Sequence, residues 1–398
     1  MTFNFTVNKS SDQGRLGTLV TPHGTVQTPA FIFCATKAAM KAVTPVQMHN
    51  CETQIILANT YHLMLQPGGE TVAKLGGLQK MTGWRGPMLT DSGGFQIFSL
   101  GHGSVANEVK GRRSSNRPKT LLKINEQGAK FKSYIDGHTY FLTPEESIRI
   151  QRNLGADLIV VLDECTPFHV DKAYTKESMR MSHRWGLRSL SEWQVYDNGT
   201  QKLYGIVQGG VYPDLRQESC NFVNDHNFFG IAIGGSLGAD KQQMHDVVSM
   251  TMNLVRKDRP VHLLGIGGIS DIFAGVKQGI DTFDCVHPTR LARHGGALVR
   301  PHNNLNQNRE HLNLRNSFYV NDDQPIEVDC GCETCTWASK GYLHHLLKAQ
   351  ELVAMTLISI HNIYFINKLM QAIRQALTDD TIDNCQKYWC NPIKINKG

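Results

Sequence analysis

Three aspartates that follow short apolar runs are the residues best suited to chemistry in this chain. Asp91 lies in "LTDSGGFQIF", Asp163 in "VVLDEC" and Asp284 in "GIDTFDCVHPTR". An aspartate within an apolar strand costs free energy unless it is paired or takes part in a reaction. Two carboxylates at one site suit glycosyl transfer, because one can attack the anomeric carbon while the other moves protons. A third could accept both hydrogen-bond donors of a guanine edge.

Each of these aspartates could instead cap the helix that follows it, which is an ordinary role for such a residue. Other polar or glycine residues also follow apolar runs, namely Asn59, Gln208, Gly234, Gly235 and Gly265. Helix capping explains any one of these positions, but it does not explain why so many of them end successive strands. We therefore interpret the set as a candidate active site.

A second group of residues has the spacing of a metal site. The pattern C-x-C-x2-C-x25-H is formed by Cys330, Cys332, Cys335 and His361. Three cysteines and one histidine suit structural zinc and leave no position open for water. His344 and His345 are weaker candidates for the fourth ligand, because they lie at the start of the same predicted helix. The sequence predicts one structural zinc ion per chain.

Eight short apolar runs must position the three aspartates. We predict strands at 30–34, 54–58, 87–90, 157–162, 203–207, 230–233, 261–265 and 282–286. Continuous apolar strands that alternate with amphipathic helices indicate a parallel sheet covered on both faces. One of these helices should start after Thr143, with Pro144 in its first turn and Gly155 at its end. Eight strands favour a (β/α)8 TIM barrel over an open doubly wound sheet, and they bring the polar strand ends to one face.

The chain divides into three predicted parts. Residues 1–286 should form the barrel, 287–341 a small zinc-binding insertion, and 342–398 a C-terminal helix (roughly 342–377) with a tail. That helix would complete both the barrel and the zinc site. Within the first part, segment 101–122 contains "KGRRSSNRPK", with five Lys or Arg and no acid. We expect an exposed basic loop there, either simply solvated or in contact with phosphates.

Composition favours a globular, cytoplasmic protein. Of 398 residues, 40% are hydrophobic and 19% charged, which is enough apolar material for a core and argues against disorder. The start lacks the apolar run of a signal peptide, and "LVAMTLISI" is too short to cross a bilayer. The net charge of +6 permits an anionic partner. Basic residues after Asp284, namely Arg290, Arg293, His294 and Arg300, suit a nucleic-acid backbone or ordinary surface charge.

The motifs together resemble the tRNA-guanine transglycosylase (queuine tRNA-ribosyltransferase) family, bacterial type, over nearly the whole chain. The strongest matches are "LANTYHL", "LTDSGGFQ", "FKSYIDG", "LDEC", "GIVQGG", "FDCVHPTR" and the zinc pattern. The resemblance implies a (β/α)8 barrel, a zinc subdomain and a homodimer. It implies that guanine at the wobble position of tRNAs with GUN anticodons (Asp, Asn, His, Tyr) is exchanged for a 7-deazaguanine through a covalent ribosyl-enzyme. No redox cofactor or ATP is implied.

The resemblance also implies the role of each site residue. Asp284 is the nucleophile and Asp91 the proton acceptor. The base-binding residues are Asp91, Ser92, Gly93, Gly94, Phe95, Asp163, Gln208, Gly235 and Leu264. The residues implied to contact the tRNA anticodon loop are Gly265, Ile266, Gly267, Gly268, Ile269, Ser270, Asp271, Thr289, Arg290, Leu291, Ala292 and Arg293. The implied zinc ligands are Cys330, Cys332, Cys335 and His361.

Some positions differ from the residue that is usual in the family, and they do not determine which base replaces guanine. Phe95 stands where tyrosine is common, and Leu264 where methionine is usual. Gly238 falls where queuine-using eukaryotic relatives have glycine, whereas Cys165 matches the bacterial form. We expect 7-aminomethyl-7-deazaguanine as the incoming base, with queuine as the alternative. Two further functions stay open, a non-catalytic zinc-bearing tRNA-binding subunit and a carbohydrate-active barrel, but the former would not need both Asp91 and Asp284.

Overall fold

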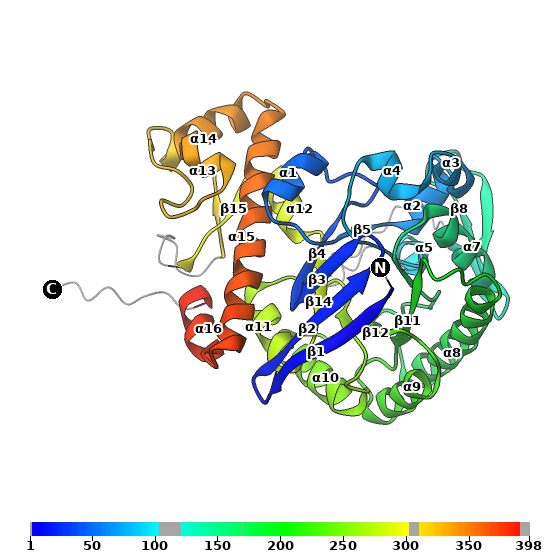
Figure 1. The fold of residues 1–398 in the computed structure, drawn as a ribbon. Coiled ribbons are helices and arrows are strands. Elements are labelled where there is room, and N and C mark those ends of the chain that lie inside the picture. Colours follow the sequence, from blue (N-terminus) through cyan, green and yellow to red (C-terminus); the bar gives the residue numbers. More distant parts are fainter. Residues whose placement is uncertain (1, 103–120, 169, 302–309, 391–398) are drawn as a thin grey trace.

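A computed structural model describes residues 2–102, 121–168, 170–301 and 310–390. Its centre is a closed barrel of eight parallel strands in the order β10-β11-β12-β13-β14-β4-β5-β6 (Figure 1). The strands are β4 (Ala30–Cys34), β5 (Ile56–Ala58), β6 (Met88–Thr90), β10 (Leu158–Val160), β11 (Lys202–Val207), β12 (Gly230–Ile233), β13 (Val261–Leu263) and β14 (Thr282–Cys285). Each lies within or overlaps a predicted strand. The predicted (β/α)8 barrel is therefore confirmed, and the open sheet is excluded by closure between β6 and β10.

Helices surround this barrel, and α7 (Pro144–Leu154) shows how the sequence defines them. Its first turn is capped by the Thr143 side chain, which accepts a hydrogen bond from the Glu146 N–H, and Gly155 ends it with a φ of 77°. All three predicted signals are confirmed. The other described helices before β14 are α1 (Pro45–Asn50), α2 (Thr60–Leu65), α3 (Gly69–Lys74), α4 (Gly77–Thr82), α5 (Gly94–His102), α8 (Lys172–Val195), α9 (Pro213–Asp225), α10 (Lys241–Leu254) and α11 (Ile269–Lys277), and α12 (His287–Arg293) follows β14.

Two three-stranded antiparallel sheets were not predicted. One consists of β1 (Asn4–Ser11), β2 (Gly14–Thr21) and β3 (Gly24–Thr28), and the other of β7 (Leu121–Asn125), β8 (Gly128–Lys132) and β9 (Thr139–Leu142). The first sheet is tied to the N-terminal end of the barrel. Arg15 pairs with Asp281, the residue before β14, and His23 Nδ1 lies 2.7 Å from Asp157 Oδ1, directly before β10. This sheet leaves the opposite end of the barrel, where the C-terminal ends of the strands lie, available for an active site.

The C-terminal part contains its own small core. Its elements are β15 (Gly296–Leu298), β16 (His311–Asn313), a 3-10 turn (Ser317–Tyr319), α13 (Glu333–Trp337), α14 (Lys340–Lys348), α15 (Val353–Thr378) and α16 (Ile382–Cys390). The expected single helix at 342–377 is wrong. It is two helices, because the chain turns at Gln350, whose φ of 60° is left-handed. Figure 1 shows α15 standing between the barrel and α13 and α14.

The segment predicted as a basic loop, 101–122, lies outside the described residues apart from its two ends. Among the helices that are described, none is long and apolar enough to cross a membrane.

Candidate active site and metal centre

Asp284 lies near the C-terminal end of β14, with 9% of its surface exposed. Its Oδ1 accepts a hydrogen bond of 2.9 Å from the Gly265 N–H and lies 3.2 Å from Nε2 of His262. Its Oδ2 contacts the Cys34 thiol, with Sγ 3.6 Å away. The carboxylate is therefore held from two neighbouring strands. One oxygen contacts two nitrogen atoms, and the other has the weak thiol donor as its contact among the residues that the structure describes.

Asp91 follows β6 and is partly buried. The Asn59 amide donates a hydrogen bond to its Oδ2, and the Thr60 N–H donates one of 2.8 Å to its Oδ1. The pKa of Asp91 is raised to about 7, chiefly by burial and also by the nearby Asp284 carboxylate, while the hydrogen bond from the Thr60 N–H acts in the opposite direction. A carboxyl group with such a pKa can both accept and release a proton at neutral pH.

Asp163 and Gln208 form a direct pair next to this site. The Gln208 amide donates a hydrogen bond to Asp163 Oδ2, and both side chains are buried. The pKa of Asp163 is raised to about 7 because the effect of burial exceeds the opposing effect of the Gln208 hydrogen bond. Gly235 has a φ of 74°, and a Cβ there would come within 2.4 Å of Gln208 Oε1. Gly94 is equally constrained, since a Cβ at this position would lie 2.6 Å from the Asp163 carbonyl oxygen.

The other predicted base-binding residues border the same region. Phe95 begins α5 with 47% of its surface exposed, so it offers a flat apolar face to solvent or to a ligand. Leu264 packs beside Gly234, where a Cβ would be 3.4 Å from Leu264 Cδ1. Ser92 and Gly93 form the turn between β6 and α5, where the Ser92 hydroxyl accepts a 3.3 Å hydrogen bond from the Gly94 N–H.

The residues implied to contact RNA fall into two groups. Gly265 and Arg290 are exposed, and Ile266, Gly268, Ser270, Leu291 and Arg293 are partly exposed. Gly267, Ile269, Asp271, Thr289 and Ala292 are buried. Asp271 is also paired with Lys241 and His245, at 3.1 Å in each case. Arg300, the last of the basic residues noted after Asp284, is paired at 3.2 Å with Glu327.

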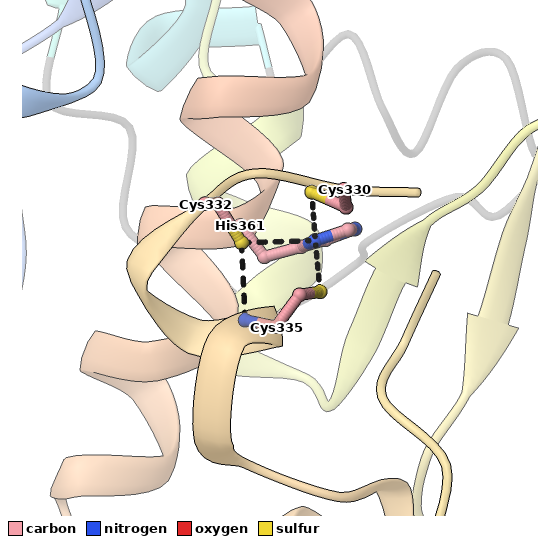
Figure 2. A group of neighbouring side chains, drawn as sticks. All are labelled: Cys330, Cys332, Cys335 and His361. Carbon is pink, nitrogen blue, oxygen red and sulfur yellow. Dashed lines mark hydrogen bonds between the residues drawn. The ribbon is translucent and has the colours of Figure 1, made fainter. Parts of the chain in front are cut away.

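The four predicted metal ligands converge although they come from two distant segments (Figure 2). Nδ1 of His361 lies 3.6, 3.6 and 3.4 Å from the sulfur atoms of Cys330, Cys332 and Cys335. A tetrahedral zinc ion with ordinary bond lengths separates its nitrogen and sulfur ligands by about 3.5 Å. His361 Nε2 lies 2.7 Å from the Leu298 carbonyl oxygen, to which it can donate, leaving Nδ1 as the free ligand atom. The site fits a metal ion with no open position.

Three residues around the site were missed from the sequence. His262 and Cys34 contact Asp284, and the fully buried Arg216 donates to the carbonyl oxygens of Gly210 and Gly234, at 2.7 and 3.0 Å. Of these three residues, only His262 could have been identified from the sequence, because a histidine inside the apolar run "VHLLG" is unusual and this run precedes the strand of Asp284.

The fold and the site define a class, that of (β/α)8-barrel proteins with carboxylates at the C-terminal face and an appended metal-binding unit. Comparison with known proteins specifies it further. The family model "Queuine tRNA-ribosyltransferase" matches residues 10–394. The chain belongs to the queuine tRNA-ribosyltransferase family, as the sequence motifs indicated.

Curated relatives support this assignment over their full length. A queuine tRNA-ribosyltransferase of Roseiflexus sp. (strain RS-1) is 43% identical over 399 residues, covering 98% of this chain and 99% of the relative. Those of Protochlamydia amoebophila (strain UWE25) and Chlamydia caviae are each 42% identical, covering 96% of this chain and 96% and 99% of the relatives.

Proposed function

We propose that this protein is a tRNA-guanine transglycosylase of queuosine biosynthesis. It exchanges guanine at the wobble position of tRNAs with GUN anticodons for a 7-deazaguanine. The observation that carries this proposal is the pair of carboxylates Asp284 and Asp91, which interact electrostatically at the C-terminal end of the barrel. Family membership and the names of the relatives support the same reaction.

The reaction is a double displacement. The target nucleotide leaves the anticodon stack, and an Asp284 oxygen attacks C1′ of its ribose. The C1′–N9 bond breaks, guanine departs with the bonding electrons, and it takes up a proton. The incoming base then gives its N9 proton to Asp91 and attacks C1′, which releases Asp284 as a carboxylate. A pKa of about 7 suits Asp91 to this proton transfer.

Asp163 and Gln208 would read the base. The ionised Asp163 can accept N1–H and the 2-amino group of guanine or of a 7-deazaguanine, which share this edge. Gly235 lets the chain pass close to Gln208, and Phe95 and Leu264 would cover the faces of the ring. The segment 265–271 and α12 would contact the anticodon loop, chiefly through the exposed Arg290 and through backbone groups.

The incoming base is 7-aminomethyl-7-deazaguanine in this proposal, with queuine as the second candidate. Gly238 supports queuine, since a missing side chain leaves room beside the 7-substituent. However, Gly238 has a φ of 129°, which favours glycine for backbone reasons alone. The glycine is therefore weaker support for a wide pocket than its sequence position suggested.

The metal would be zinc with a structural role. It would hold 287–341 against α15, because three ligands come from the insertion and the fourth from the helix. The protein would act as a cytoplasmic homodimer. The C-terminal part exposes large apolar side chains that a second copy could cover, namely Phe318, Val320, Val328, Trp337, Tyr342 and Leu352.

The test is exchange of radiolabelled guanine into unmodified tRNA carrying a GUN anticodon. Incorporation is expected for the wild-type protein, and a tRNA whose wobble guanosine is replaced by adenosine is the matched control. Binding of tRNA without incorporation would favour a non-catalytic subunit. Absence of both binding and incorporation, with activity on a carbohydrate, would favour a carbohydrate-active barrel.

A further inference from the structure

His262 is a fully buried histidine whose ring lies against the proposed nucleophile. Its Nδ1 is 2.9 Å from the Thr282 hydroxyl oxygen, and its Nε2 is 3.2 Å from Asp284 Oδ1. The Nε2 contact is close but not aligned as a hydrogen bond, and Nε2 has no other partner among the described residues. A buried polar atom without an aligned partner costs free energy, so its position calls for an explanation beyond packing.

The strand register explains how the ring reaches the carboxylate. His262 on β13 is the parallel partner of Thr282 on β14. Residues two apart on a strand point to the same face, so Thr282 and Asp284 share one face, to which the His262 ring also turns. The three side chains thus form one contiguous group, with His262 between the other two.

The proton on the ring can be assigned from its neighbours. If Nε2 lacked a proton, its lone pair would face the Asp284 carboxylate at 3.2 Å, and two acceptors would repel. A proton on Nε2 removes this conflict, and in the neutral ring Nδ1 then accepts from the Thr282 hydroxyl. The imidazolium form also carries a proton on Nε2, so both forms present an N–H to Asp284.

We propose that His262 is a positioning residue for the nucleophile Asp284, an inference that rests on the proposed function. The Gly265 N–H donates a hydrogen bond to Oδ1, and the Nε2–H of His262 faces the same oxygen at 3.2 Å, which leaves Oδ2, beside the Cys34 thiol, as the oxygen that attacks C1′. A carboxylate accepts hydrogen bonds more strongly than an ester. These donors therefore favour the return of Asp284 to its ionised form when the incoming base displaces it.

The effect of the Nε2–H donor can be isolated by comparing two substitutions of His262 whose side chains are similar in length. His262→Gln keeps an N–H near the position of Nε2, whereas His262→Met fills similar space without a donor. Losing an N–H that faces this charged oxygen without an aligned hydrogen bond should lower the rate constant by roughly 10-fold. We expect His262→Met to lower kcat for guanine exchange by this factor while KM for tRNA stays near the wild-type value. His262→Gln should restore most of the loss.

The experiment measures kcat and KM for guanine exchange in the full-length wild-type, His262→Met and His262→Gln proteins, after their melting temperatures show that each is folded. The denaturation-resistant tRNA adduct is quantified in parallel, with Asp284→Asn as the reference that forms none. Wild-type kcat in His262→Met, or equal losses in both variants, would overturn the role of the donor. If Asp284→Asn still forms the adduct, the proposed nucleophile is wrong instead, and the two failures are distinguishable.

Discussion

Replacing Asp163 with asparagine should make the protein more stable than wild type at pH 8 and lower its rate of guanine exchange. The Asp163 carboxylate is buried, and burial raises its pKa from 3.8 to about 7. In the unfolded chain the group should ionise near pH 4. Between these two values the folded protein keeps a proton that the unfolded chain has released. The free energy of unfolding therefore falls as the pH rises, until the folded group also ionises near pH 7.

The size of this effect follows from the shift. Each unit of pKa shift corresponds to about 1.36 kcal/mol of stability. The shift spans roughly three units, from about pH 4 to about pH 7, and roughly two of these fall within the range from pH 5 upward that the assay covers. Ionisation of Asp163 should therefore lower the free energy of unfolding of wild type by up to about 3 kcal/mol between pH 5 and pH 8. Asparagine cannot ionise, and its carbonyl oxygen can still accept the hydrogen bond that Gln208 donates to Asp163. The free energy of unfolding of the variant should therefore not show this decrease.

The assay is urea unfolding of wild type and Asp163→Asn at pH 5 and pH 8. The free energy of unfolding of the variant minus that of wild type should increase by up to about 3 kcal/mol from pH 5 to pH 8. Other ionisable groups such as Asp91 are present in both proteins, so their effects cancel in this difference. Asp12→Asn, at an exposed position, is the control and should show no such growth. If this difference stays constant from pH 5 to pH 8, or if the variant is less stable than wild type at pH 8, the buried Asp163 carboxyl does not control stability in this way. Guanine exchange should fall by roughly 10- to 150-fold, because an amide donor would face the donors of the base.

Three further predictions concern the metal, the incoming base and the basic segment. Cys332→Ser should lower zinc content and melting temperature, whereas Cys385→Ser, outside the cluster, should change neither; full zinc content with unchanged melting in Cys332→Ser would contradict the assignment. Gly238→Val should reduce inhibition of guanine exchange by queuine while sparing guanine exchange itself, because a β-branched side chain would fill the room beside the 7-substituent. Equal inhibition in both proteins would show that Gly238 does not set the pocket size. Neutralising the five basic residues of 101–122 should weaken tRNA binding and flatten its salt dependence, and an unchanged slope would leave the segment as a solvated insertion.

The barrel was predictable because most of its strands are short, predominantly apolar runs bounded by polar or glycine residues. Buried parallel strands leave this signal in the sequence, and the predicted cap at Thr143 was equally local. The metal ligands were readable from spacing alone, because three free cysteines within six positions are typical of a metal site and rarely occur together for packing.

The features that were missed depend on contacts between distant segments. The sheet β1–β3 is held through Arg15 and Asp281, which are far apart in sequence. The break between α14 and α15 depends on a left-handed residue, Gln350, of a type that does not usually mark a turn. The burial of Thr289 and the pairing of Arg300 likewise became visible only once the elements were packed.

The covalent bond that we propose between Asp284 and the ribose of tRNA can be detected as an adduct. The wild-type and Asp284→Asn proteins are incubated with unmodified tRNA, and the products are separated under denaturing conditions. For wild type we expect a slowly migrating adduct of protein and tRNA, which guanine should reverse. The Asp284→Asn protein should be folded and form no adduct. An adduct of equal yield in Asp284→Asn would show that Asp284 is not the nucleophile.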